Sequence, residues 1–276
     1  MSVSSEVVAA SLVEVMVEAA IAAAEVICSV YHRPIHVVTK DDGSPVTEAD
    51  AAAEAVIIAH LEPTGLPVLG EESVAAGIIP RLGARYFVVD PLDGTKEFIK
   101  RNGEFTVNIA LIEDGRPTLG VVLAPASGEI FVGDETGAWT GKVVGNSVTE
   151  RRPISVALLA RPRIVASRSH GHAALERLCR TLDVESDVSV GSSLKFCLLA
   201  RGDAQLYPRF TPTCEWDTAA GQAVLEAAGG AVLTLDGAPM RYGKGELRFL
   251  NPYFIAAATR ELAEIGAAEM RRLLPE

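Results

Sequence analysis

The chain has 276 residues, of which 49% are hydrophobic, and a formal net charge of −11. This length suffices for one sizeable domain or two closely associated ones around a large apolar core. The acidic balance argues against broad binding to nucleic acid or anionic membranes, but it allows a small anionic substrate where divalent metals reverse the local charge.

The first thirty residues predict a helix opened by a Ser4/Ser5 cap, with its glutamates facing water. These glutamates interrupt the apolar run, so no uncharged window reaches the roughly 18 residues of a membrane-spanning helix. The four cysteines have no CxxC or metal-finger spacing and are typical of buried thiols in a reducing compartment. We therefore expect a cytoplasmic protein without a transmembrane segment, with peripheral association with the inner membrane as an alternative.

The rest of the first half predicts helices and a largely antiparallel sheet. Thr47 is expected to cap a helix through EADAAAEAVIIAHL, and ARYFVVD reads as a buried strand ended by Pro91. Two β-rich runs joined by Asp114-Gly115 predict a hairpin, followed by a meander with glycine turns.

The second half alternates strands and helices, so helices can cover both faces of its sheet. The change of pattern near TERRPISVALLARP suggests a subdomain boundary. We expect an α+β or α/β chain with layered helices and sheets, divided into subdomains 1–155 and 156–276 that form one functional unit.

Acidic residues fall at the ends of four predicted elements: Asp50, Glu71-Glu72, Asp90/Asp93 and Asp217. Functional groups of α/β proteins commonly lie at such positions, and Mg²⁺ prefers oxygen ligands. These acids also have structural explanations. Asp50 fits a capping box with Thr47, Glu71 and Glu72 are typical of surface acids before a helix, and Asp93 and Asp217 both suit the start of a helix. The combination favours a metal site over four separate coincidences.

The segment Asp90-Pro91-Leu92-Asp93-Gly94-Thr95 has the parts of such a site. After Pro91 the chain is expected to turn, which brings Asp93 to the side of Asp90 and presents the Leu92 carbonyl. Gly94 and Thr95 would begin a helical turn whose free N–H groups can accept a phosphate. The DxDGT signature of haloacid-dehalogenase phosphatases is excluded, because this spacing is one residue longer.

Together with Trp216-Asp217-Thr218-Ala219-Ala220, these motifs resemble the inositol monophosphatase superfamily over most of the chain. The resemblance implies a layered αβαβα fold of the inositol monophosphatase/fructose-bisphosphatase type and a magnesium-dependent, lithium-sensitive phosphomonoesterase. Lys96-Glu97-Phe98 and the segment 191–210 are similar to the bacterial 3′(2′),5′-bisphosphate nucleotidases of the CysQ type. That likeness implies conversion of adenosine 3′,5′-bisphosphate to AMP and phosphate.

The resemblance also implies roles for individual residues. Glu71, Asp90 and the Leu92 carbonyl would hold one Mg²⁺, and Asp90, Asp93 and Asp217 a second. Glu72 would support the first site through water, and Thr95, oriented by Asp50, would help deprotonate the attacking water. The phosphoryl group would contact the amides of Gly94 and Thr95.

The second phosphate of a bisphosphate needs cations away from the metals. Lys195 and Arg209 are the candidates, helped by Ser192 and His170; all four could instead be ordinary polar residues. We expect a small-molecule nucleotide substrate, no nucleic-acid partner, and a monomer or homodimer. Two alternatives stay open: an inositol or sugar phosphatase with the same metals, and a regulator that binds metal or nucleotide without catalysis.

Overall fold

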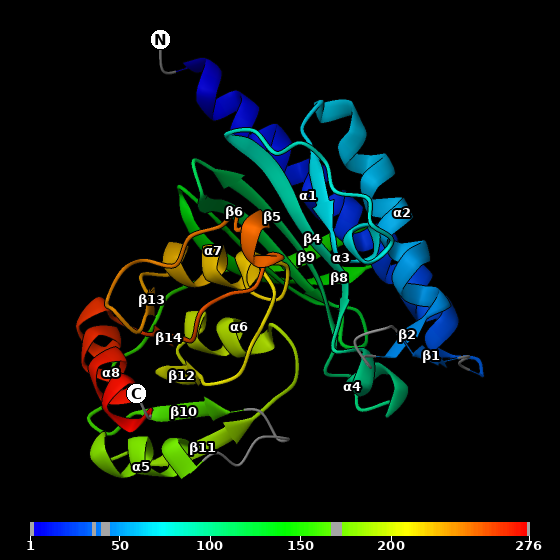
Figure 1. Cartoon of the computed structure of the whole chain (residues 1–276). Helices are drawn as coiled ribbons and strands as arrows, with labels where there is room; N and C mark the ends of the chain where they lie inside the picture. The colour runs from blue at the N-terminus through cyan, green and yellow to red at the C-terminus, as the bar shows by residue number, and fades with distance from the viewer. Residues whose placement is uncertain (1–2, 35–36, 40–44, 167–172, 275–276) are drawn as a thin grey trace.

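The computed structural model describes residues 3–34, 37–39, 45–166 and 173–274, and these build alternating layers of helices and sheets (Figure 1). The first outer layer holds α1 (Val3–Tyr31) and α2 (Glu48–Leu61). Helix α1 begins at Val3, so the predicted cap at Ser4/Ser5 is wrong and both serines lie inside its first turn. Glu14, Glu18 and Glu25 are exposed, as expected. Helix α2 begins after Thr47, which caps it.

The second layer is a seven-stranded sheet in the order β3-β4-β5-β6-β7-β8-β9. Only β3 and β4 run parallel, so the prediction of a largely antiparallel sheet is confirmed. The Asp114-Gly115 turn joins β5 to β6, and both residues have the positive φ angles that such a hairpin needs. The strands are β3 (Val68–Gly70), β4 (Arg85–Asp93), β5 (Thr106–Glu113), β6 (Arg116–Ala124), β7 (Glu129–Asp134), β8 (Gly137–Val144) and β9 (Ser147–Ile154).

Several short elements flank this sheet. A two-stranded hairpin pairs β1 (Val37–Thr39) with β2 (Pro45–Thr47). Helix α3 (Glu71–Ala75) directly follows β3, and α4 (Thr95–Ile99) follows β4. A 3-10 turn, η1 (Glu62–Thr64), extends α2, and a second, η2 (Gly245–Leu247), lies near the end of the chain.

The second sheet has the order β11-β10-β12-β14-β13 and mixes parallel with antiparallel pairs. Its strands are β10 (Arg163–Ala166), β11 (Ser186–Ser189), β12 (Leu206–Arg209), β13 (Ala231–Thr234) and β14 (Phe254–Ala257). Helices α6 (Leu194–Ala200) and α7 (Ala219–Ala227) lie between the two sheets, and α5 (Ala173–Thr181) and α8 (Arg260–Leu273) cover the outer face (Figure 1).

Side-chain alternation along the strands produces three apolar cores between these layers. Phe87 and Val89 face α1 and α2 in the first core, whereas Tyr86 and Val88 face α6 and α7 in the second. The third core packs the far face of the five-stranded sheet against α5 and α8. The predicted αβαβα layering is therefore confirmed, with the middle core shared by both halves of the chain.

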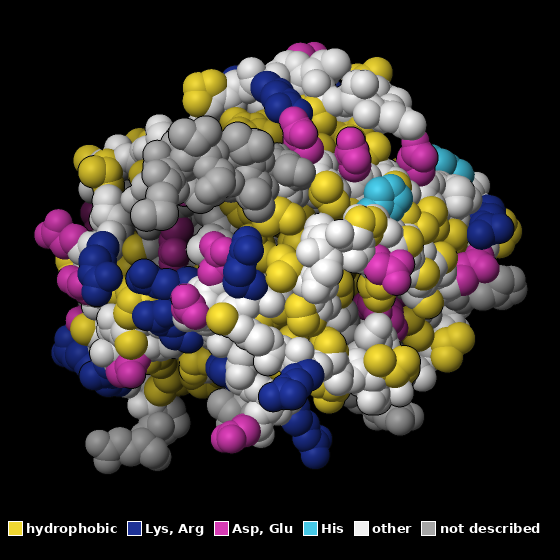
Figure 2. Space-filling view, turned by 90° about the horizontal axis from the view of Figure 1, so that it is seen from above, with side chains coloured by type: hydrophobic (Ala, Val, Ile, Leu, Met, Phe, Trp, Pro, Cys, Tyr) yellow, Lys and Arg dark blue, Asp and Glu magenta, His cyan; other side chains and the backbone are white. Residues whose placement is uncertain are grey.

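No helix in the described part of the chain is both long and apolar enough to cross a membrane. Among the described cysteines, Cys197 is buried and the other three are half-buried, and none of the four forms a disulfide. On the face in Figure 2, Lys and Arg side chains are interspersed with acidic and apolar ones.

Candidate active site and metal centre

Three carboxylates meet where the two halves of the chain adjoin. Asp90, Asp93 and Asp217 each offer one oxygen, and these oxygens lie within 4.8 Å of one another. Asp90 is buried and the other two are half-buried. The first two come from β4 and the third from the segment before α7, so residues more than 120 positions apart in the sequence form one cluster.

A β-bulge brings Asp90 and Asp93 to the same side. Asp90 pairs with Asn108 and Asp93 with Thr106, so β4 has one more residue than β5 between these pairs. The extra residue offsets the alternation that would otherwise send the two acids to opposite faces. The prediction that Pro91 ends the strand is wrong, because β4 continues through this bulge to Asp93.

The clustered charges repel one another in a buried place. Burial raises the pKa of Asp90 well above its usual range, and the charges of Glu71, Asp93 and Asp217 raise it further. Burial, followed by the charges of Asp93 and Glu71, likewise raises the pKa of Asp217 to about 8. An all-oxygen donor set with uncompensated negative charge fits a hard divalent cation such as Mg²⁺.

Asp50 uses its two carboxylate oxygens differently. Oδ2 accepts hydrogen bonds from the Thr47 backbone N–H and hydroxyl, both at 2.8 Å, which completes the capping box of α2. Oδ1 accepts a hydrogen bond from the Thr95 hydroxyl at 3.1 Å. The structural and functional interpretations of Asp50 are therefore compatible, because one carboxylate makes both sets of contacts.

Gly94 and Thr95 begin α4 as predicted. Gly94 has a φ of 95°, and a Cβ atom there would lie 3.1 Å from the Glu104 carbonyl oxygen. Both observations favour glycine, which tolerates positive φ and the close approach of a neighbouring backbone. The Thr95 hydroxyl also lies 3.3 Å from the Leu92 carbonyl oxygen, which connects it to the bulge.

Glu71 and Glu72 form the first turn of α3, and a buried glutamate from another helix holds that turn. Glu54 of α2 accepts hydrogen bonds from the backbone N–H groups of Glu72 and Ser73, both at 2.8 Å. Sequence reasoning missed Glu54, although it follows Asp50 by four residues and so lies on the same helix face. Helix α2 thus contacts both the Thr95 segment and the Glu71 segment.

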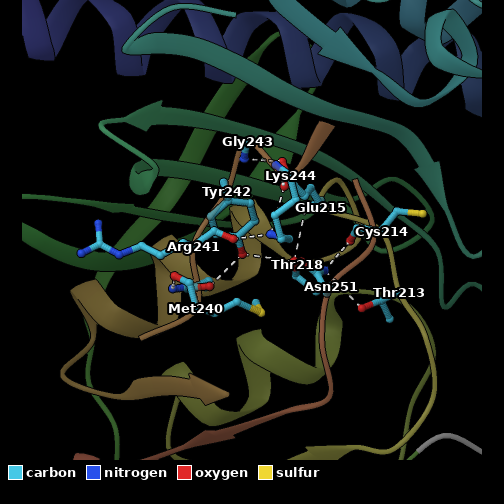
Figure 3. Close-up of polar contacts among 11 residues, drawn as sticks. Thr213, Cys214, Glu215, Thr218, Met240, Arg241, Tyr242, Gly243, Lys244 and Asn251 are labelled. Atoms are coloured by element: carbon cyan, nitrogen blue, oxygen red, sulfur yellow. Dashed lines mark hydrogen bonds and ion pairs between the residues drawn. The ribbon is translucent and has the colours of Figure 1, made fainter. Parts of the chain in front are cut away.

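A second buried network holds the segment that carries Asp217 (Figure 3). The fully buried Glu215 carboxylate accepts hydrogen bonds from the backbone N–H groups of Gly243 and Lys244, and its Oε1 lies 2.9 Å from Lys244 Nζ. Asn251 donates to the Cys214 carbonyl oxygen at 2.7 Å. Because these partners lie far ahead in the sequence, no local pattern could have revealed the network.

The predicted anion-binding residues are partly brought together. Lys195, 5% exposed, donates from Nζ to the Ser192 carbonyl oxygen at 3.0 Å. Burial lowers the pKa of Lys195 to about 8, and the nearby charges of Arg209 and Asp93 act on it in opposite directions. Ser192 precedes α6 with a φ of 49°, and His170 lies outside the described residues. A cationic group thus lies close to the carboxylate cluster.

A buried carboxylate cluster at the junction of two sheets defines a candidate metal centre for reactions of anionic substrates. The family model for the inositol monophosphatase family matches residues 9–274. The chain belongs to that family, as its motifs predicted.

Relatives within the family are similar over most of the chain. A protein of Escherichia coli strain K12 named 3′(2′),5′-bisphosphate nucleotidase CysQ is 49% identical over 236 residues, which cover 84% of this chain and 94% of the relative. The crystal structure of CysQ from Bacteroides thetaiotaomicron is 40% identical, has a TM-score of 0.75, and covers 90% of this chain and 97% of its own. An inositol monophosphatase from Anabaena, 23% identical with a TM-score of 0.73, shares the fold; the alignment covers 96% of this chain and 97% of that one.

Proposed function

We propose that the protein is an Mg²⁺-dependent phosphomonoesterase that hydrolyses the 3′-phosphate of adenosine 3′,5′-bisphosphate to AMP and phosphate. The observation that carries this proposal is the Asp90–Asp93–Asp217 cluster beside the Thr95–Asp50 pair. The similarity to the CysQ proteins, whose names specify the bisphosphate nucleotidase activity, supports the choice of substrate.

In this proposal, Glu71, Asp90 and the Leu92 carbonyl would hold one Mg²⁺, while Asp90, Asp93 and Asp217 would hold a second. Glu72 supports the first site. Divalent cations held by these residues would neutralise the phosphate dianion, make a water more acidic and stabilise the leaving oxygen. The raised pKa values of Asp90 and Asp217 support the assignment, because they identify negative charge that the protein itself leaves uncompensated.

The proposed proton acceptor for the attacking water is the Thr95 hydroxyl. Its hydrogen is directed toward Asp50 Oδ1 at 3.1 Å, so a lone pair on Thr95 Oγ1 is available to the water. As the water proton passes to Thr95 Oγ1, the Thr95 hydroxyl proton passes to Asp50 Oδ1. The water oxygen bonds to phosphorus while the bond from phosphorus to the ribose 3′-oxygen breaks, and the released 3′-oxygen takes a proton from solvent. The backbone N–H groups of Gly94 and Thr95, at the start of α4, would donate to the phosphoryl oxygens.

The distal 5′-phosphate is assigned to Lys195 and Arg209, with Ser192 and His170 in supporting roles. Lys195 supports this assignment best, because a buried ammonium group favours an anionic partner. The Ser192 hydroxyl oxygen is buried and has no hydrogen-bond partner among the described residues, so a side-chain rotation that brought it to a ligand would break no hydrogen bond.

We also propose that residues 1–155 and 156–276 act as two subdomains of one functional unit. Support comes from the middle core, where Val88 and Phe131 pack in the same cluster as Phe196 and Phe254. We expect the protein to work in the cytoplasm as a monomer or homodimer, without a nucleic-acid partner.

A substrate panel tests the proposed activity. Phosphate release is measured with adenosine 3′,5′-bisphosphate, adenosine 3′-monophosphate and inositol 1-phosphate, with Mg²⁺, with EDTA and with added Li⁺. The bisphosphate should give the highest kcat/KM, EDTA should abolish turnover, and Li⁺ should inhibit it. A higher kcat/KM on inositol 1-phosphate would favour the alternative inositol phosphatase instead.

The Asp93→Asn variant separates catalysis from mere binding. It removes one of the three clustered carboxylates while nearly preserving side-chain volume. We expect kcat to fall by roughly a hundredfold or more, with weaker activation by Mg²⁺. A wild-type protein that binds the nucleotide but shows no Mg²⁺-dependent hydrolysis would support the non-catalytic alternative.

A further inference from the structure

Two buried side chains outside the acid set contact it directly. Ser193, 2% exposed, is the N-cap residue of α6, and Asn108, 1% exposed, lies on β5. Ser193 Oγ lies 2.9 Å from Asp93 Oδ2 and 2.8 Å from the Asp217 carbonyl oxygen. Asn108 Nδ2 lies 2.9 Å from Ser193 Oγ and 3.3 Å from Asp93 Oδ2. One hydroxyl therefore contacts both acidic residues.

The number of hydrogens that Asn108 and Ser193 can donate determines which group donates and which accepts in this network. The Asn108 amide has two hydrogens, one for Ser193 Oγ and one for Asp93 Oδ2. The opposite amide orientation would place its oxygen against the Asp93 carboxylate, where two acceptors would meet. The single hydrogen of Ser193 is then shared between Asp93 and the Asp217 carbonyl oxygen, and burial leaves little room for water to replace it.

The network also spans the junction between the two halves of the chain. Asp93 ends β4, Asp217 precedes α7, and Ser193 begins α6. Two contacts hold Asn108 against the acids of β4. Its backbone pairs with Asp90 in the neighbouring strand, and its side-chain amide donates to the Asp93 carboxylate. Ser193 thus links the Asp93 carboxylate to the backbone of Asp217, whose own carboxylate accepts a hydrogen bond from the Cys214 backbone N–H at 2.8 Å.

We propose that Ser193 is a positioning residue, held by Asn108, that sets the separation of Asp93 and Asp217 for a bound divalent cation. This inference rests on the proposed function, because it takes both acids as metal ligands. Ser193 also lies between Ser192 and Lys195 in the sequence, so it joins the segment assigned to the distal phosphate to the metal ligands. Its hydroxyl acts through Asp93 and not on the substrate.

Calorimetric titration with Mn²⁺, without substrate, tests the inference by a readout that is independent of activity. Ser193→Ala should bind Mn²⁺ about tenfold more weakly than the wild type, in line with other residues that orient metal ligands. At saturating metal, kcat for the bisphosphate should fall and KM should change little. The loss should not grow when Asn108→Ala is added, because the two side chains act as one unit.

Thr140→Ala is the matched control. Thr140 is also 2% exposed, and its hydroxyl donates to the Ile130 carbonyl oxygen at 2.8 Å, within the meander and remote from the acids in the sequence. It should lower the melting temperature and leave Mn²⁺ affinity unchanged. Ser193→Cys, which keeps the side-chain shape with a somewhat larger atom and donates weakly, covers the case in which Ser193→Ala does not fold; it too should bind Mn²⁺ more weakly.

Wild-type affinity in Ser193→Ala or in Ser193→Cys would overturn the inference and leave the proposed function intact. Equal losses of affinity in Ser193→Ala and Thr140→Ala would also overturn it, because a general loss of stability would then explain both. Failure of the wild type itself to bind Mn²⁺ would contradict the proposed function.

Discussion

Lys195 is the residue on which substrate choice depends most in this account. Its ammonium group is buried, and the charges of Asp93 and Asp217 act on it. Among the described residues, however, Lys195 forms no ion pair with a carboxylate. An anion brought by the substrate would supply the missing partner. The neighbouring aromatic residue Tyr207 is a core residue and not a candidate for substrate binding. It is 5% exposed and packs edge-on against Phe196 and Phe254.

The Lys195→Ala variant should raise KM for adenosine 3′,5′-bisphosphate by about ten- to hundredfold, the range for a lost charged hydrogen bond. Hydrolysis of adenosine 3′-monophosphate should change little, because this substrate has no distal phosphate. Steady-state kinetics on both substrates measure the difference. Lys100→Ala, which removes an exposed lysine, is the control for net charge. Equal effects of Lys195→Ala on both substrates would remove Lys195 from the substrate site.

At the scale of elements, a strand bulge and a short helical turn, not the long helices, carry four of the acidic residues of the site. The bulge in β4 orients two acids, and the first turn of α3 carries two more, with Glu54 of α2 accepting hydrogen bonds from backbone N–H groups of that turn. Gly70 precedes that turn, and a Cβ atom on it would lie 2.5 Å from the Glu54 carboxyl group. The close approach of Glu54 therefore requires glycine at position 70.

Gly70→Ala should displace Glu54, lower the melting temperature and weaken Mg²⁺ activation by about tenfold. The backbone at Gly70 has a φ of −105°, so the effect would come from the steric clash and not from backbone strain. Gly83→Ala is the control, since a Cβ atom there would meet no atom within 4 Å. Thermal unfolding and Mg²⁺ titration of activity measure both variants, and indistinguishable behaviour of the two would contradict the role given to Glu54.

The sequence predicted the elements and the acids better than the contacts that hold them. Local patterns sufficed for the Thr47 cap and the Asp114-Gly115 turn, because neighbouring residues determine both. The strand boundary predicted at Pro91 was wrong, because the bulge that carries β4 on to Asp93 depends on the register of the partner strand β5. Asn108, Ser193 and Glu215 carry no local signal, because their hydrogen-bond partners Asp93, Ser193, Gly243 and Lys244 lie 15 to 100 residues away in the sequence.

On the scale of the whole molecule, the negative charge of the site opposes folding when no metal is bound. The pKa of Asp217 is raised to about 8, so the folded state holds a proton that the unfolded state releases near pH 4. The resulting stabilisation is fully present below about pH 4 and is lost as the pH rises through about 8. Asp90 contributes in the same direction.

Metal-free protein should therefore melt at progressively lower temperature between about pH 5 and pH 8, and Mg²⁺ should stabilise it more at the higher pH. Above about pH 8 the lowered pKa of Lys195 acts in the opposite sense, which limits the test to that window. Calorimetric melting in EDTA and in Mg²⁺ measures the effect. Asp217→Asn should flatten the pH dependence in EDTA, and an unchanged slope in this variant would contradict the assignment to Asp217.

Anomalous diffraction from crystals soaked in Mn²⁺ tests whether carboxylates from both halves of the chain hold a divalent cation. We expect an anomalous peak in contact with oxygens of Asp90, Asp93 and Asp217, and a weaker peak or none in Asp93→Asn crystals. Absence of a peak among these three residues at saturating Mn²⁺ would show that they do not form a metal site.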